Sequence, residues 1–426
     1  MIKIFDIKKI ELCEILKREE SASGVEECVR DIISDVRKNG DAALFKYAER
    51  FDKAKICKLE VSKEEIDEAM EMVEPEYIEI LKEAAANITL YHEKQLNRGF
   101  EIRKENGVIL GQKVLPVDRA GLYVPGGTAA YPSTVLMDAI PAKIAGVKEL
   151  CIATPPQSDG KINPVILAAA RIAGVDRIFK MGGAGAVAAL AYGTESVPNV
   201  DKIVGPGNVF VAEAKRQVYG VVSIDMIAGP SEILVIADST CNPVFVAADL
   251  LSQAEHDKNA SAVLVTDSVS LAQEVQKELE RQIPLLPREE IARASIDNNG
   301  KIIIVDSIED AIEISNEIAP EHLEICVDNP FDYLDSVRHA GSIFLGKMCP
   351  EALGDYFSGT NHTLPTSGTA KFSSPLSVDD FVKKSAYSFY TESALFEVAD
   401  KVAFFAEKEG LHAHAKSAKV RIKGDI

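Results

Sequence analysis

The stretch RIFKMGGAGAVAALAY, residues 177–192, indicates the fold because it joins an apolar strand to a helix through a glycine turn. The same strand-then-helix unit recurs on both sides of it. The pattern predicts strands at 120–124, 149–153 and 202–204, and helices at 130–145, 164–173 and 208–219. Such alternation, with short connections rich in Gly and Pro, is typical of a parallel sheet covered by helices.

A second alternating series begins at residue 232. Its strands are predicted at 233–237, 262–266, 301–305, 323–327 and 342–345, and its helices at 243–256, 268–282 and 308–318. The two series together predict an α/β fold with two doubly wound, Rossmann-like lobes and mainly parallel sheets.

The two lobes and their extensions can be given bounds. We expect a first lobe of residues 21–122 with 232–376, and a second lobe of residues 123–231 that carries the glycine turns. Small helical extensions are expected at 1–20 and 377–426. Helical periodicity is also seen at 26–50 and 63–94.

Composition excludes several classes of protein. The 426 residues include 47 basic and 66 acidic side chains, and the net charge of -19 disfavours binding to nucleic acid. Residues 1–21 contain no apolar run long enough for a signal peptide or a membrane span, so we expect a cytoplasmic protein. The seven cysteines form no Cys-x-x-Cys pair, which disfavours both a disulfide framework and a thiolate zinc site.

Three glycine turns follow predicted strands of the second lobe. They lie at 123–128, 182–185 and 204–208, and Gly183, Gly185 and Ala188 match a loose Gly-x-Gly-x-x-Ala pattern. Such turns also arise from close packing alone. Three of them at one sheet edge favour a nucleotide-binding crevice, because open α/β sheets bind ligands where their strands end.

Polar groups gather at three further places. Asp249, Gln253 and His256 share one face of the predicted helix 243–256, although a histidine near a helix end is more often a cap than a metal ligand. The loop 354–366 holds Asp355 and His362 among residues that also simply make turns. Glu321-His322 is either an exposed pair or an acid-base pair for oxidising an alcohol, since imidazole accepts protons near neutral pH.

Six motifs occur together and in order, and as a set they resemble the histidinol dehydrogenase family over most of the chain. The motifs are Tyr123-Val124-Pro125-Gly126-Gly127, Gly205-Pro206-Gly207-Asn208, Gly229-Pro230-Ser231-Glu232, Ser252-Gln253-Ala254-Glu255-His256-Asp257, Pro320-Glu321-His322-Leu323-Glu324 and Asn361-His362-Thr363-Leu364-Pro365-Thr366.

The resemblance implies a homodimer whose site is completed across the interface by the C-terminal tail. One zinc ion per subunit would be bound by Gln253, His256, Asp355 and the partner subunit's His414. Substrate contacts would come from these four residues and from Ser231, His322, His362 and Glu409. Cofactor contacts would come from Tyr123, Asn208 and position 185, where the family usually has Gln and this chain has Gly185. The glycine removes a side-chain contact to NAD, and the Gly-x-Gly-x-x-Ala match depends on that same glycine.

The resemblance also implies a reaction in histidine biosynthesis. L-Histidinol would be oxidised through L-histidinal to L-histidine with two NAD, with Glu321 and His322 as the catalytic acid-base groups. One alternative is a paralogous zinc-dependent NAD dehydrogenase acting on another small polyol or sulfonate alcohol. Another is a non-catalytic nucleotide-binding protein, which disagrees with the presence of Glu321, His322, Asp355 and His362.

Overall fold

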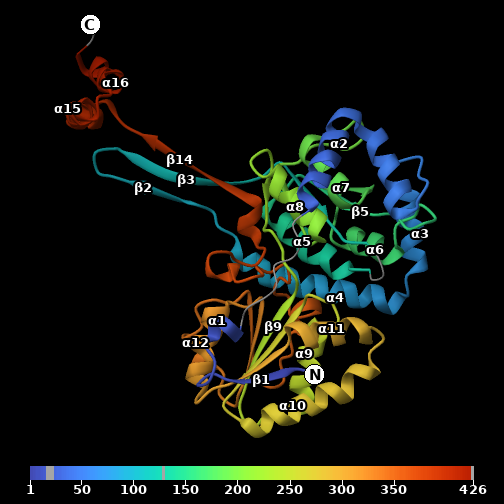
Figure 1. Cartoon of the computed structure of the whole chain (residues 1–426). Coiled ribbons are helices and arrows are strands. Elements are labelled where there is room, and N and C mark those ends of the chain that lie inside the picture. Colours follow the sequence, from blue (N-terminus) through green and yellow to red (C-terminus); the bar gives the residue numbers. More distant parts are fainter. Residues whose placement is uncertain (16–23, 127–129, 424–426) are drawn as a thin grey trace. The chain divides into compact units, whose positions relative to one another are not determined.

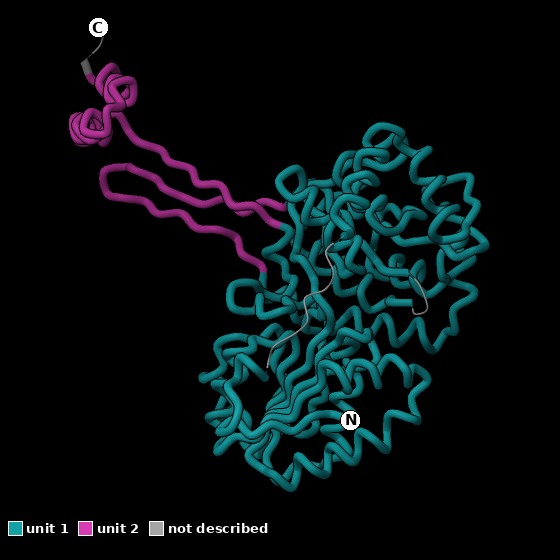
Figure 2. Tube along the Cα trace, viewed as in Figure 1, with its two compact units in different colours: residues 1–95, 117–381 teal, residues 96–116, 382–426 magenta. Residues whose placement is uncertain are grey.

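The computed structural model describes residues 1–15, 24–126 and 130–423. They form two compact units, one of residues 1–95 with 117–381 and one of residues 96–116 with 382–426 (Figure 2). Gly127 and Thr128 of the first glycine turn, and residues 16–20 of the N-terminal extension, lie outside the described ranges. The first unit contains two lobes, each with a parallel sheet (Figure 1), so the predicted fold class is confirmed.

The first lobe is built on a six-stranded parallel sheet. Its strand order is β1 (Lys3–Asp6), β11 (Lys301–Ile304), β10 (Ser261–Thr266), β9 (Glu232–Ala237), β12 (His322–Cys326) and β13 (Ser342–Leu345). One face packs on α9 (Pro243–Ala254), α10 (Val269–Gln282) and α11 (Glu289–Asn299), and the other on α12 (Ile308–Ile318). Strand β9 is buried along its whole length, as expected for a central parallel strand covered on both faces.

The second lobe has a five-stranded parallel sheet. Its strand order is β6 (Arg177–Lys180), β5 (Glu149–Thr154), β4 (Arg119–Tyr123), β7 (Lys202–Val204) and β8 (Ser223–Ile224). One core cluster joins it to α2 (Val25–Tyr47), α7 (Gly183–Tyr192) and α8 (Val209–Val218). Another joins it to α3 (Lys63–Met72), α4 (Pro75–His92), α5 (Pro132–Ala145) and α6 (Pro164–Ile172).

Two N-terminal predictions differ from the structure. Residues 3–6 form strand β1 beside β11, not a helix, because their apolar side chains alternate between the two cores of the first lobe. Only Leu12–Ile15 of the extension is helical. The single helix predicted at 63–94 is two helices, since Pro75 begins α4 and restricts the residue before it. The proposed lobe boundaries stay a prediction.

The second unit differs from the helical tail that we predicted. Strand β14 (Val382–Phe389) pairs antiparallel with β3 (Ile109–Pro116), which also pairs with β2 (Phe100–Arg103). Helices α15 (Glu392–Lys408) and α16 (His412–Lys423) follow. Their buried core is a cluster of Ala403, Ala406 and Ala415. Such a small core leaves many large apolar side chains of this unit on its surface.

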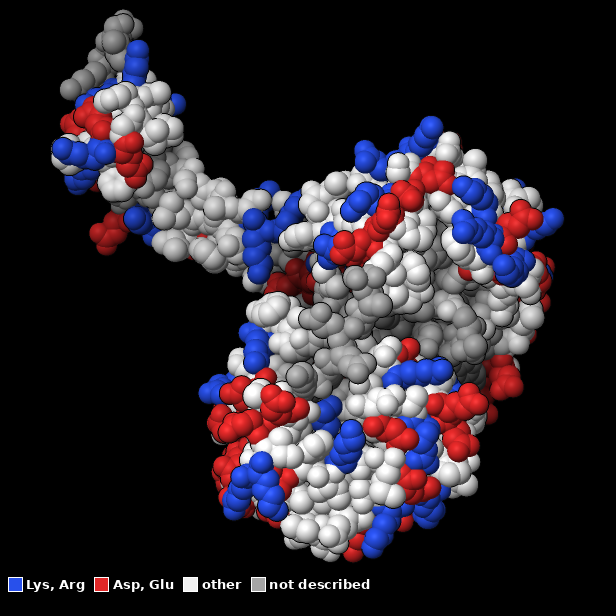
Figure 3. Space-filling model, viewed as in Figure 1, with Lys and Arg blue, Asp and Glu red and all other residues white. Residues whose placement is uncertain are grey.

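The surface carries both signs of charge. On the face in Figure 3, Asp and Glu side chains lie interspersed with Lys and Arg over both lobes. In the described ranges, no helix combines the length and the low polarity that crossing a bilayer requires.

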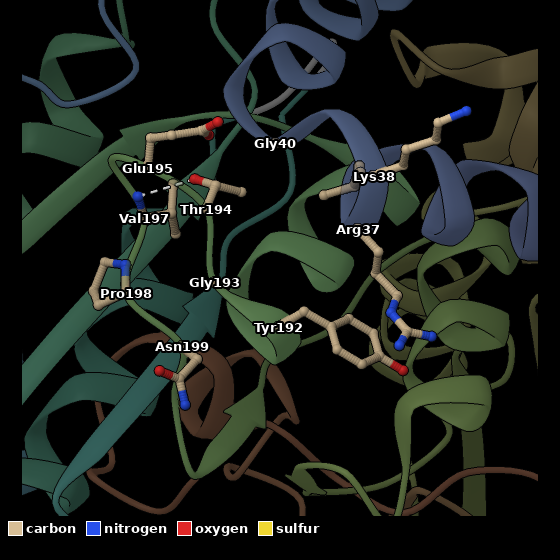
Figure 4. Close-up of a pocket in the computed structure, with 11 residues that line it drawn as sticks. Arg37, Lys38, Gly40, Tyr192, Gly193, Thr194, Glu195, Val197, Pro198 and Asn199 are labelled. Atoms are coloured by element: carbon tan, nitrogen blue, oxygen red, sulfur yellow. Dashed lines mark hydrogen bonds between the residues drawn. The ribbon is translucent and has the colours of Figure 1, made fainter.

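Helix α2 is kinked at Gly40, beside a surface hollow (Figure 4). Gly40 has φ 51° and ψ −131°, and the hollow is lined by Arg37, Tyr192 and Glu195 among others. Glu195 accepts a hydrogen bond from the Asp41 N–H at 2.8 Å, and the Arg37 guanidinium lies 4.4 Å from the centre of the Tyr192 ring. The contacts therefore fasten the kinked helix to the loop before β7.

We expect Gly40→Ala to lower the free energy of unfolding by about 3 kcal/mol, because alanine is strained at this positive φ and its Cβ displaces the Glu195 carboxylate from the Asp41 N–H. An added Cβ would lie 2.1 Å from the Glu195 Oε2 atom. Gly220→Ala is the matched control: Gly220 also has a positive φ, but its Cβ would meet nothing within 4 Å, so a loss of about 1 kcal/mol is expected. Urea unfolding measures both, and equal losses would contradict the role of the Glu195 contact.

Candidate active site

The first-lobe residues of the candidate site lie where strands begin. Glu232 opens β9 and His322 opens the neighbouring β12, with His322 paired in register with Ile233. Ser231 immediately precedes β9 and is half-buried. The N-terminal ends of two adjacent parallel strands therefore bring Ser231, Glu321 and His322 to the same edge of the sheet.

The imidazole of His322 has a defined orientation. Its Nδ1 atom lies 3.0 Å from the carbonyl oxygen of Glu232. Because a carbonyl oxygen only accepts, Nδ1 carries the hydrogen and Nε2 keeps its lone pair in the neutral ring. Nε2 is buried and has no hydrogen-bond partner among the described residues. The ring also stacks on Phe344, with centroids 6.1 Å apart. This arrangement points a proton acceptor into the site.

Glu321 lies on the other side of the same imidazole. Its Oε2 atom accepts the N–H of Glu232 at 2.8 Å and lies 3.7 Å from His322 Nδ1. Burial raises the pKa of the Glu321 carboxyl to about 8. Burial alone would lower the pKa of His322, but the carboxylates of Glu321 and Asp355 outweigh it and raise that pKa to about 10.

Asp355 is contacted by two imidazoles. It lies in the short helix α14 (Ala352–Tyr356), and its Oδ1 atom is 3.8 Å from His322 Nε2 and 3.7 Å from His362 Nδ1. Burial would raise the pKa of Asp355, but His322 and His362 lower it overall. Burial lowers the pKa of His362. His256 contributes in the same direction to the lowered pKa of Asp355.

Gln253 and His256 do not share one helix face as predicted. Helix α9 ends at Ala254, and His256 is exposed in the turn that follows, where its N–H donates to the Gln253 carbonyl at 3.1 Å. The Gln253 side chain is 1% exposed, and neither atom of its amide has a partner in the part of the chain that the structure describes. An unpartnered buried amide fits a ligand to a metal ion. Asp249 instead bonds to Glu324.

Sequence reasoning missed Glu351. It is 2% exposed, and its Oε2 atom has no partner among the described residues. Ligand atoms of His322, Glu351 and Asp355 lie within 4.8 Å of one another, close enough to hold one cation. In the sequence, only the spacing of Glu351 from Asp355, one helical turn away, could have indicated that Glu351 belongs to the site.

The predicted cofactor residues lie at the C-terminal edge of the second-lobe sheet. The Tyr123 hydroxyl, at the end of β4, accepts the N–H of Gly183 at 3.0 Å. Asn208 is exposed and caps α8 through its Oδ1 atom. Gly185 is buried, and a Cβ there would contact Tyr47 and Leu44 at 3.4 and 3.6 Å. Position 185 therefore faces helix α2.

The remaining predicted residues belong to the second unit. Glu409 follows α15 and His414 lies in α16, and both side chains are exposed. They are thus available to a partner.

A buried network lies between α5 and the glycine turn at 205–208. Asp138 of α5 is fully buried and accepts the Thr363 hydroxyl at 2.9 Å. Lys215 forms a buried ion pair with Asp225 and donates to the Gly205 carbonyl at 3.0 Å. Burial, and secondarily the Asp225 charge, raises the pKa of Asp138 to about 8. Asp138 is therefore protonated at neutral pH.

Comparisons with known proteins agree on one family. The model of the family described as histidinol dehydrogenase matches residues 16–422. A histidinol dehydrogenase from Clostridium acetobutylicum is 59% identical over 93% of this chain and 92% of its own length. One from Bacillus thuringiensis is 56% identical over 98% of this chain and 97% of its own. The crystal structure of histidinol dehydrogenase from Elizabethkingia anophelis superposes with a TM-score of 0.94 at 40% identity, over 99% of this chain and 98% of that one.

We expect Asp138→Asn to flatten the dependence of stability on pH. A carboxyl whose folded-state pKa is raised keeps a proton that the unfolded chain releases, so its stabilisation is complete below about pH 4 and is lost as pH rises to about 8. Asparagine keeps an acceptor for Thr363 and does not titrate. Thermal unfolding at pH 5 and pH 8 should show a smaller drop for the variant than for the wild type; an equal drop would mean that Asp138 does not hold this proton.

Proposed function

This chain belongs to the histidinol dehydrogenase family, and we propose that it oxidises L-histidinol through L-histidinal to L-histidine, with two NAD reduced. Family membership makes the chain an oxidoreductase of histidine biosynthesis that uses NAD and a metal ion. One histidinol, two NAD and one water would give histidine, two NADH and three protons. The observation that carries the proposal is the buried group of His322, Glu321 and Asp355, joined by His362. We place the enzyme in the cytoplasm.

We propose that Gln253, His256, Asp355 and the partner subunit's His414 bind one zinc ion per subunit. Support comes from the buried, unpartnered amide of Gln253 and from the Asp355 carboxylate beside two imidazoles. Imidazole nitrogen with carboxylate and amide oxygen suits zinc. A bound zinc ion would orient the amino alcohol and offset the Asp355 charge that otherwise favours protonated His322.

We propose that His322 and Glu321 move the protons. Nε2 of His322 accepts the proton of the alcohol as the first hydride leaves for NAD, because Nδ1 is committed to the Glu232 carbonyl. Glu321, with His322, then takes a proton from the water that adds to the aldehyde. The hydrate loses the second hydride to the second NAD. The buried position of both groups keeps the aldehyde away from bulk water.

We propose contacts to the substrate and the cofactor from the residues that border this group. Ser231 precedes the strand that orients His322, and His362 contacts Asp355. The partner's Glu409 would act beside the partner's His414. Tyr123 and Asn208 would contact NAD, and at Gly185 the contact would be limited to the backbone.

We infer that the second unit mediates a homodimer. Its helices and strands expose an unusual number of large apolar side chains, which mark protein-binding surfaces. They are Leu96, Phe100, Ile102, Leu115, Tyr387, Phe389, Tyr390, Phe396, Val402, Phe404, Phe405 and Leu411. Because Glu409 and His414 lie in the same unit, a second copy of the chain is the occupant that also completes the site.

The yield of NADH tests the proposed reaction. We expect two NADH per L-histidinol, with activity lost on chelation and restored by Zn²⁺, because each oxidation passes one hydride and the metal holds the substrate. A paralogous dehydrogenase for another small alcohol would leave L-histidinol unused. A yield of one NADH per histidinol would contradict the proposed second oxidation. Full activity after complete metal removal would contradict the proposed role of the metal ion.

Replacing Glu321 and His322 by Gln together should lower kcat by at least about 10³-fold, since proton transfer is lost. The variant should still contain one zinc ion per subunit, as neither residue is a proposed ligand. Steady-state kinetics and metal analysis of the same sample measure both effects. Wild-type turnover would contradict the role of the pair, and loss of zinc would assign it to the metal site instead.

Phe404→Asp combined with Phe405→Asp should give a monomer that has lost activity, because the partner's His414 no longer reaches the site. Sedimentation measures the mass, and Phe331→Asp is the control, since Phe331 is an equally exposed aromatic residue of the first lobe. A dimeric double variant, or a fully active monomer, would overturn this assembly.

A further inference from the structure

Helix α5 contacts the segment 361–363 through three positions on one face. Met137 and Asp138 follow Thr134 by three and four residues, so all three positions lie close together on the helix surface. They bond respectively to His362, Asn361 and Thr363. Each residue of the short segment is thus held by a different residue of α5. The segment lies within residues 357–368, none of which belongs to a helix or strand.

The imidazole of His362 is fixed from both sides. Its Nε2 atom lies 3.2 Å from the Thr134 hydroxyl, and its Nδ1 atom lies 3.7 Å from Asp355 Oδ1. Thr134 is 2% exposed, so water does not replace it easily. Rotating the ring away from Asp355 would break the Thr134 bond. Loss of this hydroxyl would leave the ring free to turn.

The side-chain amide of Asn361 bonds through both its nitrogen and its oxygen. Its amide nitrogen donates to the Met137 carbonyl at 2.7 Å and lies 3.4 Å from Nε2 of His92, while its oxygen accepts the N–H of Thr363 at 2.9 Å. Nδ1 of His92 lies 2.8 Å from the carbonyl oxygen of Ile88, so Nε2 is the acceptor. His92 is fully buried, and its ring contacts this segment.

Thr363 links the same segment to the third glycine turn, at 204–208. Its hydroxyl donates to Asp138 Oδ1 at 2.9 Å, and Asp138 Oδ2 lies close to Gly205, where a Cβ would be only 2.9 Å away. Helix α5 itself follows the first glycine turn, at 123–128. The segment that carries His362 is therefore held by an element that borders two of the three glycine turns.

We propose that Thr134 and Thr363 are positioning residues for L-histidinol oxidation: their hydroxyls hold His362 against Asp355 and so set the geometry in which the substrate binds. This inference rests on the proposed function and extends it to residues that touch neither the metal nor the reacting atoms. Leaving the buried partner of such a hydrogen bond unpaired costs more free energy than the bond itself contributes.

The test replaces each hydroxyl by a methyl group of the same size. Thr134→Val should raise KM for histidinol about tenfold, with KM for NAD changed less than about twofold, because a loss of about 1.4 kcal/mol in ground-state binding is a factor of ten. Thr134→Ser, which keeps the hydroxyl, should restore KM to within about threefold. Thr363→Val should act in the same direction.

Thr89→Val is the matched control. Thr89 is also a helical threonine, and its hydroxyl donates to the Ala85 carbonyl of α4 away from the segment. We expect unchanged kinetics for it, with a comparable change in melting temperature. Unchanged kinetics in both Thr134→Val and Thr363→Val would overturn the proposal, and so would equal defects in Thr134→Val and Thr134→Ser. If the wild-type enzyme did not oxidise histidinol, the proposed function itself would be contradicted. If the valine variants changed only the melting temperature, Thr134 and Thr363 would have a structural role and no positioning role.

Discussion

The candidate site depends on one carboxylate, that of Asp355, which is 14% exposed and contacted at less than 4 Å by two imidazoles. A charged group in such surroundings is stable only when paired or bound to a metal ion. His322 and His362 supply part of that pairing, and ligand atoms of Glu351 and His322 lie within 4.8 Å of Asp355. A divalent cation bound to Asp355 would complete the pairing and would free His322 to accept a proton.

The two lobes contribute opposite edges of their sheets. In the second lobe, Tyr123, Gly183 and Asn208 lie where strands end, as expected for nucleotide binding. In the first lobe, the polar groups lie where β9 and β12 begin. The segment 361–363 of the first lobe is bonded to α5 of the second lobe, and His362 in this segment contacts Asp355. We propose that substrate chemistry belongs to the first lobe and cofactor binding to the second.

Local patterns predicted most of the fold. Strands such as β7 and β13 and helix α12 have the bounds expected from apolar periodicity. Strand β14 and the hairpin of β2 and β3 were missed, since their side chains are mostly exposed and lack an apolar pattern. Glu321, His322 and Asp355 were chosen from motifs. Glu351 stands four residues before Asp355 but in none of the six motifs, and the proximity of Thr134 to the site arises only when distant segments pack together.

Anomalous diffraction at the zinc edge, from crystals grown with Zn²⁺, tests the central claim most directly. The account predicts one peak per subunit, bonded to Asp355, Gln253 and His256 and to His414 of the partner subunit, with His322 Nε2 left unbound. A peak held by His322, Glu351 and Asp355, with Gln253 turned away, would contradict the assignment of His322 as the proton acceptor.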